Sequence, residues 1–161
     1  GSWGRMLAKI DNRGEAEQIF EYKKGTSSPF KDIFYLQEYI EKPGRDIRAY
    51  VIGDETIGAA YRNSDHWITN AARGGKSTRC EITEDLNNIC QEASKAVGGG
   101  ALAIDLFEVD NGYTVNEINC CMEFKESQKS IEEDIPKYLI DYVQQQQAEK
   151  QSSEEKVKCL I

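Results

Sequence analysis

The chain has 161 residues, a formal net charge of -8 and 39% hydrophobic residues, which is the composition of a globular protein of about one domain. No apolar run reaches membrane-spanning length and no signal peptide is recognisable, so we exclude a membrane partner and expect a cytoplasmic location. The acidic balance argues against nucleic acid as a partner. The five cysteines form no CxxC pair, which predicts reduced thiols rather than a disulfide framework or a zinc site.

The first half of the chain alternates short apolar runs with turns. Apolar runs predict strands at 6–10 and 34–40, and helical spacing of apolar residues between them predicts an amphipathic helix over 15–24. Two further strands, 47–52 and 56–61, flank Gly53-Asp54-Glu55 and predict a hairpin. The polar segment 62–78 is predicted to be a long loop, and such loops often carry functional residues.

The second half begins with a helix signal. Thr83 is a good N-cap, and the helix that follows is predicted to end at three consecutive glycines, 98–100. Strands are predicted at 101–107 and 113–118, and a last helix opens near Pro136. The segment 144–161 is rich in Gln, Glu, Lys and Ser, which predicts a disordered tail. The expected class is α+β, with one domain over 1–143.

The hairpin formed by the strands 101–107 and 113–118 carries two acids. A three-residue turn would pair Val109 with Tyr113, and counting four residues away from that pair puts Asp105 opposite Glu117. Opposed carboxylates repel unless a cation neutralises them, and oxygen ligands favour Mg²⁺, with Mn²⁺ as an alternative. Asn119 adds an amide oxygen on the same side. From the hairpin alone, a solvated sheet face whose acids never meet is an equal alternative.

Other motifs are weaker when each is taken alone. The run Gly74-Gly75-Lys76-Ser77 imitates the end of a P-loop, but the full pattern needs a glycine where Asn70 stands, so we reject a P-loop enzyme. His66 is the only histidine, and no catalytic triad can be assembled. The glycine-rich start of the chain, the segment 37–48 and the arginines of the loop 62–78 are each better explained, without context, as ordinary turns or solvated polar segments.

Taken together and in order, the motifs resemble a known family. They are GSWGR at 1–5, QEYIEKPGRDIR at 37–48, HWITNAARGG at 66–75, AIDLFE at 103–108, VNEIN at 115–119 and MEFK at 122–125. The chain resembles the RimK-like branch of the ATP-grasp superfamily, and within it the LysX-like ligases of lysine biosynthesis, to which an archaeal arginine form is related. The resemblance covers residues 1–143 and implies an ATP-grasp fold of antiparallel sheets with packed helices.

The resemblance also implies a reaction. Members of the family use ATP to make an acyl phosphate from a carboxylate, which an amine then attacks to give an amide. For a LysX-like ligase the partners are a small acidic amino-group carrier protein, whose C-terminal glutamate is activated, and a small amino acid, α-aminoadipate or glutamate. A homo-oligomer is expected for the full-length enzyme. The alternatives are a RimK-like glutamate ligase acting on a protein tail and a non-catalytic nucleotide-binding fragment.

Roles carried over by position complete the prediction. The metal ligands are Asp105, Glu117 and Asn119. The residues around the phosphates and the acyl phosphate are Arg48, Arg62, Asn70 and Arg73. The nucleotide-binding residues are Gly1, Ser2, Gly4 and Arg5 over the phosphates, Gln37, Glu38, Tyr39 and Ile40 along the adenine, and Asp46 at the ribose. Such chemistry rests on positioning and charge neutralisation, so no protein nucleophile is expected.

Three features depart from the family pattern. The chain begins at the glycine loop, so the family's N-terminal domain and its phosphate-binding lysines are expected outside it. Cys120-Cys121 stands where a His-Thr pair is expected after the metal asparagine, and Glu126-Ser127 stands where Asn and a small residue are expected. The first departure bears on whether the chain is active alone, and the other two bear on which amino acid is used.

Overall fold

The structure is a computed structural model that describes residues 7–69 and 76–158, with side chains as far as Ser152. The chain divides into two compact units, 1–41 and 42–161. No helix in the described part is both long enough and apolar enough to cross a membrane.

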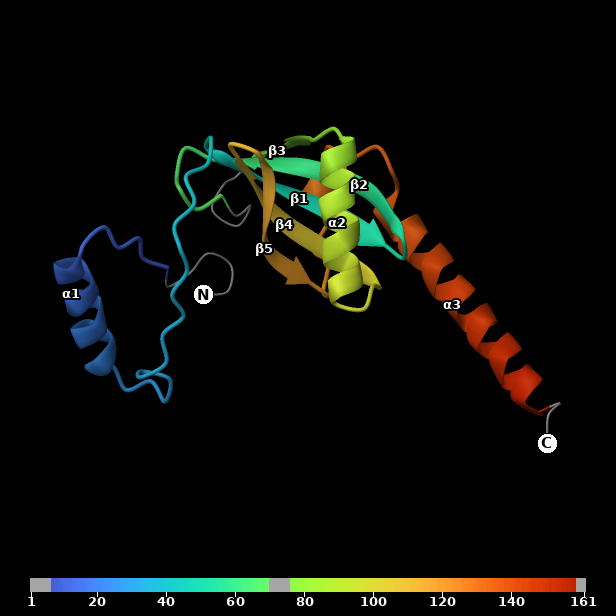
Figure 1. The fold of residues 1–161 in the computed structure, drawn as a ribbon, viewed down its shortest axis with the longest axis horizontal. Helices are drawn as coiled ribbons and strands as arrows, with labels where there is room; N and C mark the ends of the chain where they lie inside the picture. The colour runs from blue at the N-terminus through green and yellow to red at the C-terminus, as the bar shows by residue number, and fades with distance from the viewer. Residues whose placement is uncertain (1–6, 70–75, 159–161) are drawn as a thin grey trace. The chain divides into compact units, whose positions relative to one another are not determined.

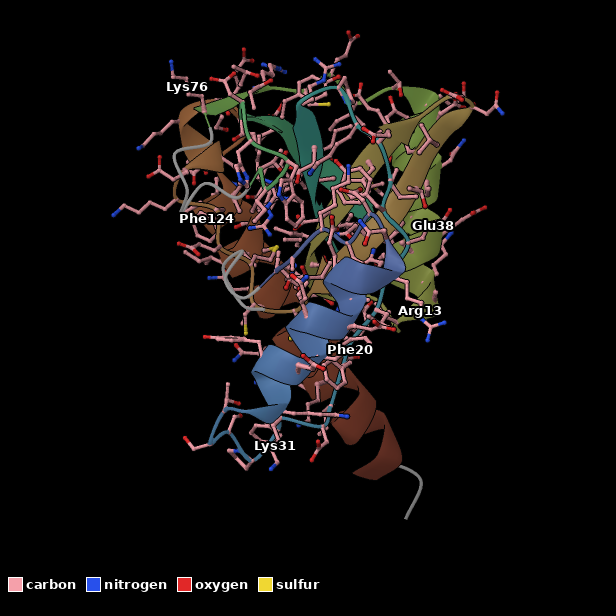
Figure 2. All side chains as sticks on the ribbon, turned by 90° about the vertical axis from the view of Figure 1, so that its left-hand side faces the viewer. Arg13, Phe20, Lys31, Glu38, Lys76 and Phe124 are labelled. Atoms are coloured by element: carbon pink, nitrogen blue, oxygen red, sulfur yellow. The ribbon has the colours of Figure 1, made fainter. Side chains whose placement is uncertain are left out.

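The described part of the first unit, 7–41, contains the helix α1 (Arg13–Lys24), as the sequence predicts. Asn12 caps it, because its side-chain oxygen accepts the backbone N–H of Glu15 at 3.0 Å, and the Glu15 carboxylate accepts the N–H of Asp11 in return. Arg13 and Phe20 project from α1 (Figure 2). The Phe20 ring meets the Phe34 ring edge-on, with 4.5 Å between the centroids.

The two strands predicted in the first unit are wrong. Residues 7–10 and 34–40 have no regular secondary structure, and Met6 lies outside the described residues. A strand needs a neighbour for its backbone N–H and C=O groups, and within the described part neither segment pairs with another strand. None of their apolar side chains is buried, and several are exposed, as Tyr35 and Leu36 show.

The second unit is built on one antiparallel sheet with the strand order β3-β2-β1-β4-β5 (Figure 1). The strands are β1 (Arg45–Ile52), β2 (Glu55–Asn63), β3 (Lys76–Arg79), β4 (Ala101–Val109) and β5 (Gly112–Asn119). Both predicted hairpins are present, and the end of the predicted loop 62–78 contributes the edge strand β3. The sheet with its helices gives the predicted α+β class.

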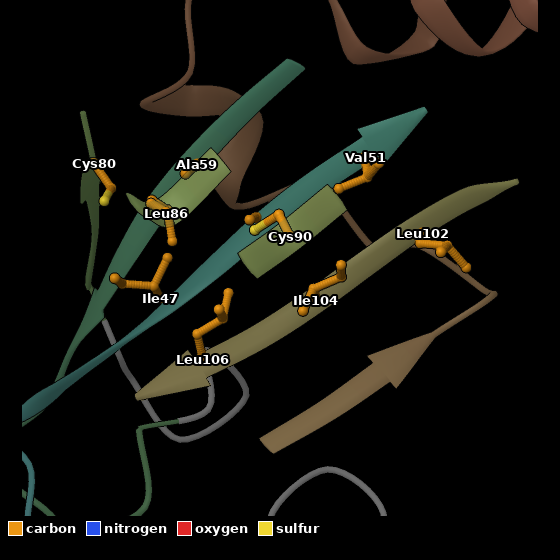
Figure 3. Packing of buried hydrophobic residues seen from close by; sticks show 10 residues of the cluster. Ile47, Val51, Ala59, Cys80, Leu86, Cys90, Leu102, Ile104 and Leu106 are labelled. Carbon is orange, nitrogen blue, oxygen red and sulfur yellow. The ribbon is translucent and has the colours of Figure 1, made fainter. Parts of the chain in front are cut away.

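Helix α2 (Glu84–Ala96) packs across one face of this sheet (Figure 1). Thr83 caps it as predicted, by accepting the N–H of Leu86. Leu86 and Cys90 are fully buried against the alternate residues of β1 and β4 that point to this face (Figure 3). Packing against α2 fixes which face of β1 and β4 points to the helix. The residues that alternate with those in contact with α2 must therefore point to the opposite face of the sheet.

The opposite face is apolar at one end and charged at the other. At the apolar end, Tyr50 and Ile52 of β1 are buried with Ile131 and Ile135, which belong to the segment after a short 3₁₀ helix (Ser127–Lys129) and to the start of α3 (Ile135–Lys158). The charged end of the same face contains the residues of the candidate site.

The predicted disordered tail is instead helical. α3 continues through 144–158, and residues 159–161 lie outside the described part. Gln, Glu and Lys are good helix formers, and side-chain contacts one turn apart add to this, as between Gln145 and Glu149 at 3.0 Å. A lack of apolar residues therefore does not predict disorder where most residues are good helix formers.

Candidate active site

Side-chain alternation along β1 puts Asp46 and Arg48 on the face opposite α2. Antiparallel register then sets Asp46 opposite Arg62 of β2 and Arg48 opposite Asp105 of β4. Directly opposed residues share a face of the sheet, so four charged side chains from three adjacent strands meet. Their signs alternate, and each charge therefore finds its counter-charge on the neighbouring strand.

Asp105 is contacted by both arginines of this charged row. Arg48 donates two hydrogen bonds to the Asp105 carboxylate, from Nε to Oδ1 at 2.7 Å and from Nη2 to Oδ2 at 2.9 Å. Nη2 of Arg62 lies 3.0 Å from the same Oδ2. The Asp105 side chain is 4% exposed. Burial alone would lower the pKa of either arginine, but the charge and hydrogen bonds of the carboxylates raise both pKa values above the ordinary range.

Asp46 also has several partners. Arg62 donates to both of its oxygens, at 2.6 and 2.8 Å, and the hydroxyl of Thr69 donates to Oδ2. The Lys42 ammonium lies 3.6 Å from Asp46 and donates to Thr69 at 2.9 Å. Burial lowers the pKa of Lys42 and outweighs the attraction of Asp46. In this arrangement both Asp46 oxygens are engaged by Arg62, so the predicted contact with a ribose stays a prediction.

The predicted opposition of Asp105 and Glu117 is present, but the register behind it differs. The hairpin turn has two residues rather than three, so Val109 pairs with Gly112 instead of Tyr113. That change alone would shift the pairing by one residue. A bulge at Asn116, between Leu106–Val115 and Asp105–Glu117, shifts it back. The two irregularities cancel, and Asp105 stands opposite Glu117.

Asn119 lies two residues beyond Glu117 and opposite Ala103, so it shares their face. Its Nδ2 is buried and has no hydrogen-bond partner among the described residues, which leaves the amide with an unsatisfied polar end there. The two ends of an asparagine amide are distinguished only by their partners, so Oδ1 can occupy the same position. An acceptor oxygen there would be satisfied by a cation, and this fits the predicted metal site.

A cation here would be held by two carboxylates and an amide. In the described part of the chain, no group of three or more His, Cys, Asp or Glu side chains could hold a metal ion. The predicted set of ligands is different, because its third member is an asparagine. Glu117 is exposed and has no recorded hydrogen bond or ion pair among the described residues. The set Asp105, Glu117 and Asn119 therefore offers oxygen ligands only, which is the donor set of Mg²⁺.

The other predicted site residues are distributed differently. Gln37, Glu38, Tyr39 and Ile40 belong to the first unit, where Lys9 lies over the Tyr39 ring at 4.1 Å. Six further predicted site residues lie outside the described part of the chain: Gly1, Ser2, Gly4, Arg5, Asn70 and Arg73. Thus the structure brings together Asp46, Arg48, Arg62, Asp105, Glu117 and Asn119.

Sequence reasoning missed the ion pairs of the charged row, together with Lys42 and Thr69. A count from the two-residue turn of the first hairpin would pair Asp46 with Tyr61. A bulge at Ile57 moves the pairing by one residue and brings Arg62 opposite Asp46. The available signal was a set of acids and arginines at alternate positions of otherwise apolar strands, since buried charges need partners.

The class of protein follows from comparison with known families. The model of the RimK-like ATP-grasp domain matches residues 1–143, and the chain belongs to this family.

Curated relatives in the family are ligases. The chain is 41% identical to the alpha-aminoadipate–LysW ligase LysX of Saccharolobus solfataricus over 143 residues, which are 88% of this chain and 52% of that protein. It is 34% identical to the glutamate–LysW ligase ArgX of Sulfurisphaera tokodaii over 148 residues, which are 90% of this chain and 52% of that protein. The chain therefore spans about half the length of the curated relatives it matches.

Solved structures agree on the fold. The ATP-grasp ligase PsnB complexed with minimal precursor matches with a TM-score of 0.54 at 28% identity, over 66% of this chain and 35% of that one. The same ligase complexed with minimal precursor, Mg and ADP matches with a TM-score of 0.52 at 22% identity, over 65% and 33%. These matches confirm the predicted ATP-grasp fold.

Proposed function

We propose that the chain is part of an ATP-dependent ligase that joins α-aminoadipate, or glutamate, to the C-terminal glutamate of a small acidic amino-group carrier protein. The observation that carries the proposal is the row of Asp105, Glu117 and Asn119 beside Arg48, in a chain of the RimK-like family. LysX and ArgX are named for ligation to LysW, and PsnB was solved with Mg and ADP. The row supports Mg²⁺ as the cation, with Mn²⁺ as an alternative.

The proposed reaction has two steps. A carboxylate oxygen attacks the terminal phosphorus of ATP, and the bond from that phosphorus to ADP breaks, which gives an acyl phosphate. The amine then attacks the acyl carbon, phosphate leaves, and the nitrogen loses a proton as the amide forms. Both steps move negative charge between oxygens without a protein nucleophile, so fixed cationic groups are the main contribution the protein must make.

Two acids and an amide would hold the cation, and the neighbouring arginines would bind the anionic phosphates. Asp105, Glu117 and Asn119 supply its oxygen ligands, and the cation, when bound, neutralises charge on the polyphosphate. Arg48 is 17% exposed, so its guanidinium can reach an anion at the surface of the sheet. Arg62 is more deeply buried between two carboxylates, and its first role in the proposal is to orient Asp46 and Asp105.

The remaining parts of the proposal follow the family. Asp46, together with Gln37, Glu38, Tyr39 and Ile40, would serve the nucleoside, and Gly1, Ser2, Gly4, Arg5, Asn70 and Arg73 would serve the phosphates. We also propose a cytoplasmic enzyme that assembles as a homo-oligomer at full length. Cys80, Cys90, Cys120 and Cys121 are free thiols, which suits a reducing compartment.

Release of ADP tests the function. The chain is assayed alone and in a chimera in which residues 1–143 replace the matching segment of the Saccharolobus solfataricus LysX. We expect ADP release that requires both a LysW-type carrier and one amino acid from a panel containing α-aminoadipate and glutamate. The parent LysX is the positive control, and the chimera carrying Asp105→Asn is the matched negative control.

The outcomes separate the proposal from its alternatives. Glutamate-dependent release on a protein tail without the carrier would favour a RimK-like protein ligase. Nucleotide binding without release under any combination would favour a non-catalytic binding domain. Absence of amino-acid-dependent and carrier-dependent release from both the chain and the chimera, with the parent active, would sink the proposed function.

A further inference from the structure

Arg48 is bound where the cation of the proposed site has to bind. Its guanidinium binds both oxygens of Asp105, at 2.7 and 2.9 Å. Among the residues that the structure describes, Glu117 is exposed opposite Asp105, and Nδ2 of Asn119 has no hydrogen-bond partner. Asp105 is thus already paired with positive charge from the same protein, from Arg48 at both of its oxygens and from Arg62 at Oδ2. A metal cation that binds Asp105 would therefore lie close to the positively charged guanidinium of Arg48.

We propose that Arg48 is an internal counter-ion of Asp105, which makes this site take a divalent cation together with a polyphosphate in preference to the cation alone. This inference rests on the proposed function. To bind Asp105, the cation has to weaken or displace the bidentate pair with Arg48. A cation without an anion leaves the displaced guanidinium unpaired close to a second positive charge, which is unfavourable at a partly buried site.

A polyphosphate changes the balance. Its oxygens can accept the guanidinium that leaves Asp105, so Arg48 exchanges one oxyanion partner for another instead of losing one. Arg62 limits how far the row rearranges, since Asp46 holds it with two hydrogen bonds and it remains beside Asp105. Arg48 is therefore the partner that moves, and the cation and the polyphosphate bind with positive coupling.

The test measures the affinity for Mn²⁺, read from its electron paramagnetic resonance signal, with and without ADP. For the unmodified chain we expect weak binding of Mn²⁺ alone and much tighter binding with ADP. For Arg48→Met, removal of the competing charge-assisted pair is expected to strengthen binding of Mn²⁺ alone on the order of tenfold. The same change is expected to shrink the gain that ADP brings. The two effects have opposite signs, which a general loss of structure cannot produce.

Two further variants keep the test decisive. Arg48→Lys keeps the positive charge but cannot form the bidentate pair, so an affinity for Mn²⁺ alone between those of the unmodified chain and Arg48→Met is expected. If Arg48→Met does not fold, the affinity of Arg48→Lys tests the proposal. Arg45→Met is the matched control, because Arg45 makes an equivalent bidentate pair with Glu108, at 2.6 and 2.8 Å, away from Asp105. Its affinity for Mn²⁺ is expected to be unchanged.

The failures of the two proposals can be told apart. If Asp105→Asn leaves Mn²⁺ binding unchanged, the metal site of the proposed function is wrong. If Mn²⁺ binding depends on Asp105 but Arg48→Met and Arg48→Lys leave the affinity for Mn²⁺ alone unchanged or weaker, the metal site stands and the counter-ion role of Arg48 is refuted.

Discussion

Replacing Asp105 by asparagine is expected to abolish binding of Mg-ATP to this chain. Asp105 is the buried ligand of the proposed site, and asparagine removes the charge that both the cation and Arg48 use. Loss of a group that only supports a metal ligand costs about 10–100-fold in affinity, so loss of the ligand itself should exceed about 100-fold. Calorimetric titration with Mg-ATP measures the effect.

Two variants separate binding from folding in that experiment. Glu117→Gln removes the second carboxylate at an exposed position with no recorded ion pair in the described part, so it should weaken Mg-ATP binding with little change in the unfolding midpoint. Glu108→Gln alters an acid of the same strand that pairs with Arg45 instead, and binding should be unaffected. Mg-ATP binding by Asp105→Asn at the affinity of the unmodified chain would refute the assignment.

Replacing Arg62 by methionine is expected to produce the largest loss of stability. Arg62 is the shared partner of Asp46 and Asp105, and its side chain and theirs are almost inaccessible to water. Methionine fills most of the volume but leaves Asp46 without its main counter-charge. Breaking a buried pair in this way costs about 3–5 kcal/mol of the free energy of unfolding. Urea unfolding followed by circular dichroism measures the loss.

Arg45→Met is the matched control for stability. Arg45 and Glu108 form a bidentate pair of the same geometry in the same sheet, but their side chains are 35% and 24% exposed. Solvent screens such a pair, and its loss is expected to cost less than about 1 kcal/mol. If Arg62→Met lowers the free energy of unfolding no more than Arg45→Met does, the idea that burial makes the ion pairs of Arg62 important for stability is wrong.

The strong periodic elements could be predicted from the sequence. Helix α2 has Thr83 as its cap and a clear apolar stripe, and both hairpins have glycine at their turns, so local residues determine them. The strand predicted at 34–40 failed because apolar residues alone do not supply a neighbouring strand. The tail at 144–158 failed for a different reason, because a polar segment of good helix formers can extend a helix that is already anchored by Ile135.

The candidate site was predicted in part, and the limits come from register. Asp105 and Glu117 were correctly placed opposite each other, although the count behind that placement missed the short turn and the bulge at Asn116. The pairing of Asp46 with Arg62 depends on a second bulge, at Ile57, and residue type alone does not reliably predict where a bulge occurs. Motif resemblance pointed to the proposed ligands, whereas only the three-dimensional structure showed that Arg48 is already bound to one of them, Asp105.

The central claim is that Asp105, Glu117 and Asn119 bind the cation that accompanies ATP. The most direct measurement is anomalous scattering from a crystal of this chain grown with Mn²⁺ and ADP. We predict that the strongest anomalous peak lies within coordination distance of oxygens from all three residues and contacts the ADP phosphates. A peak held by other side chains, or bound ADP with no manganese against these three residues, would contradict the account.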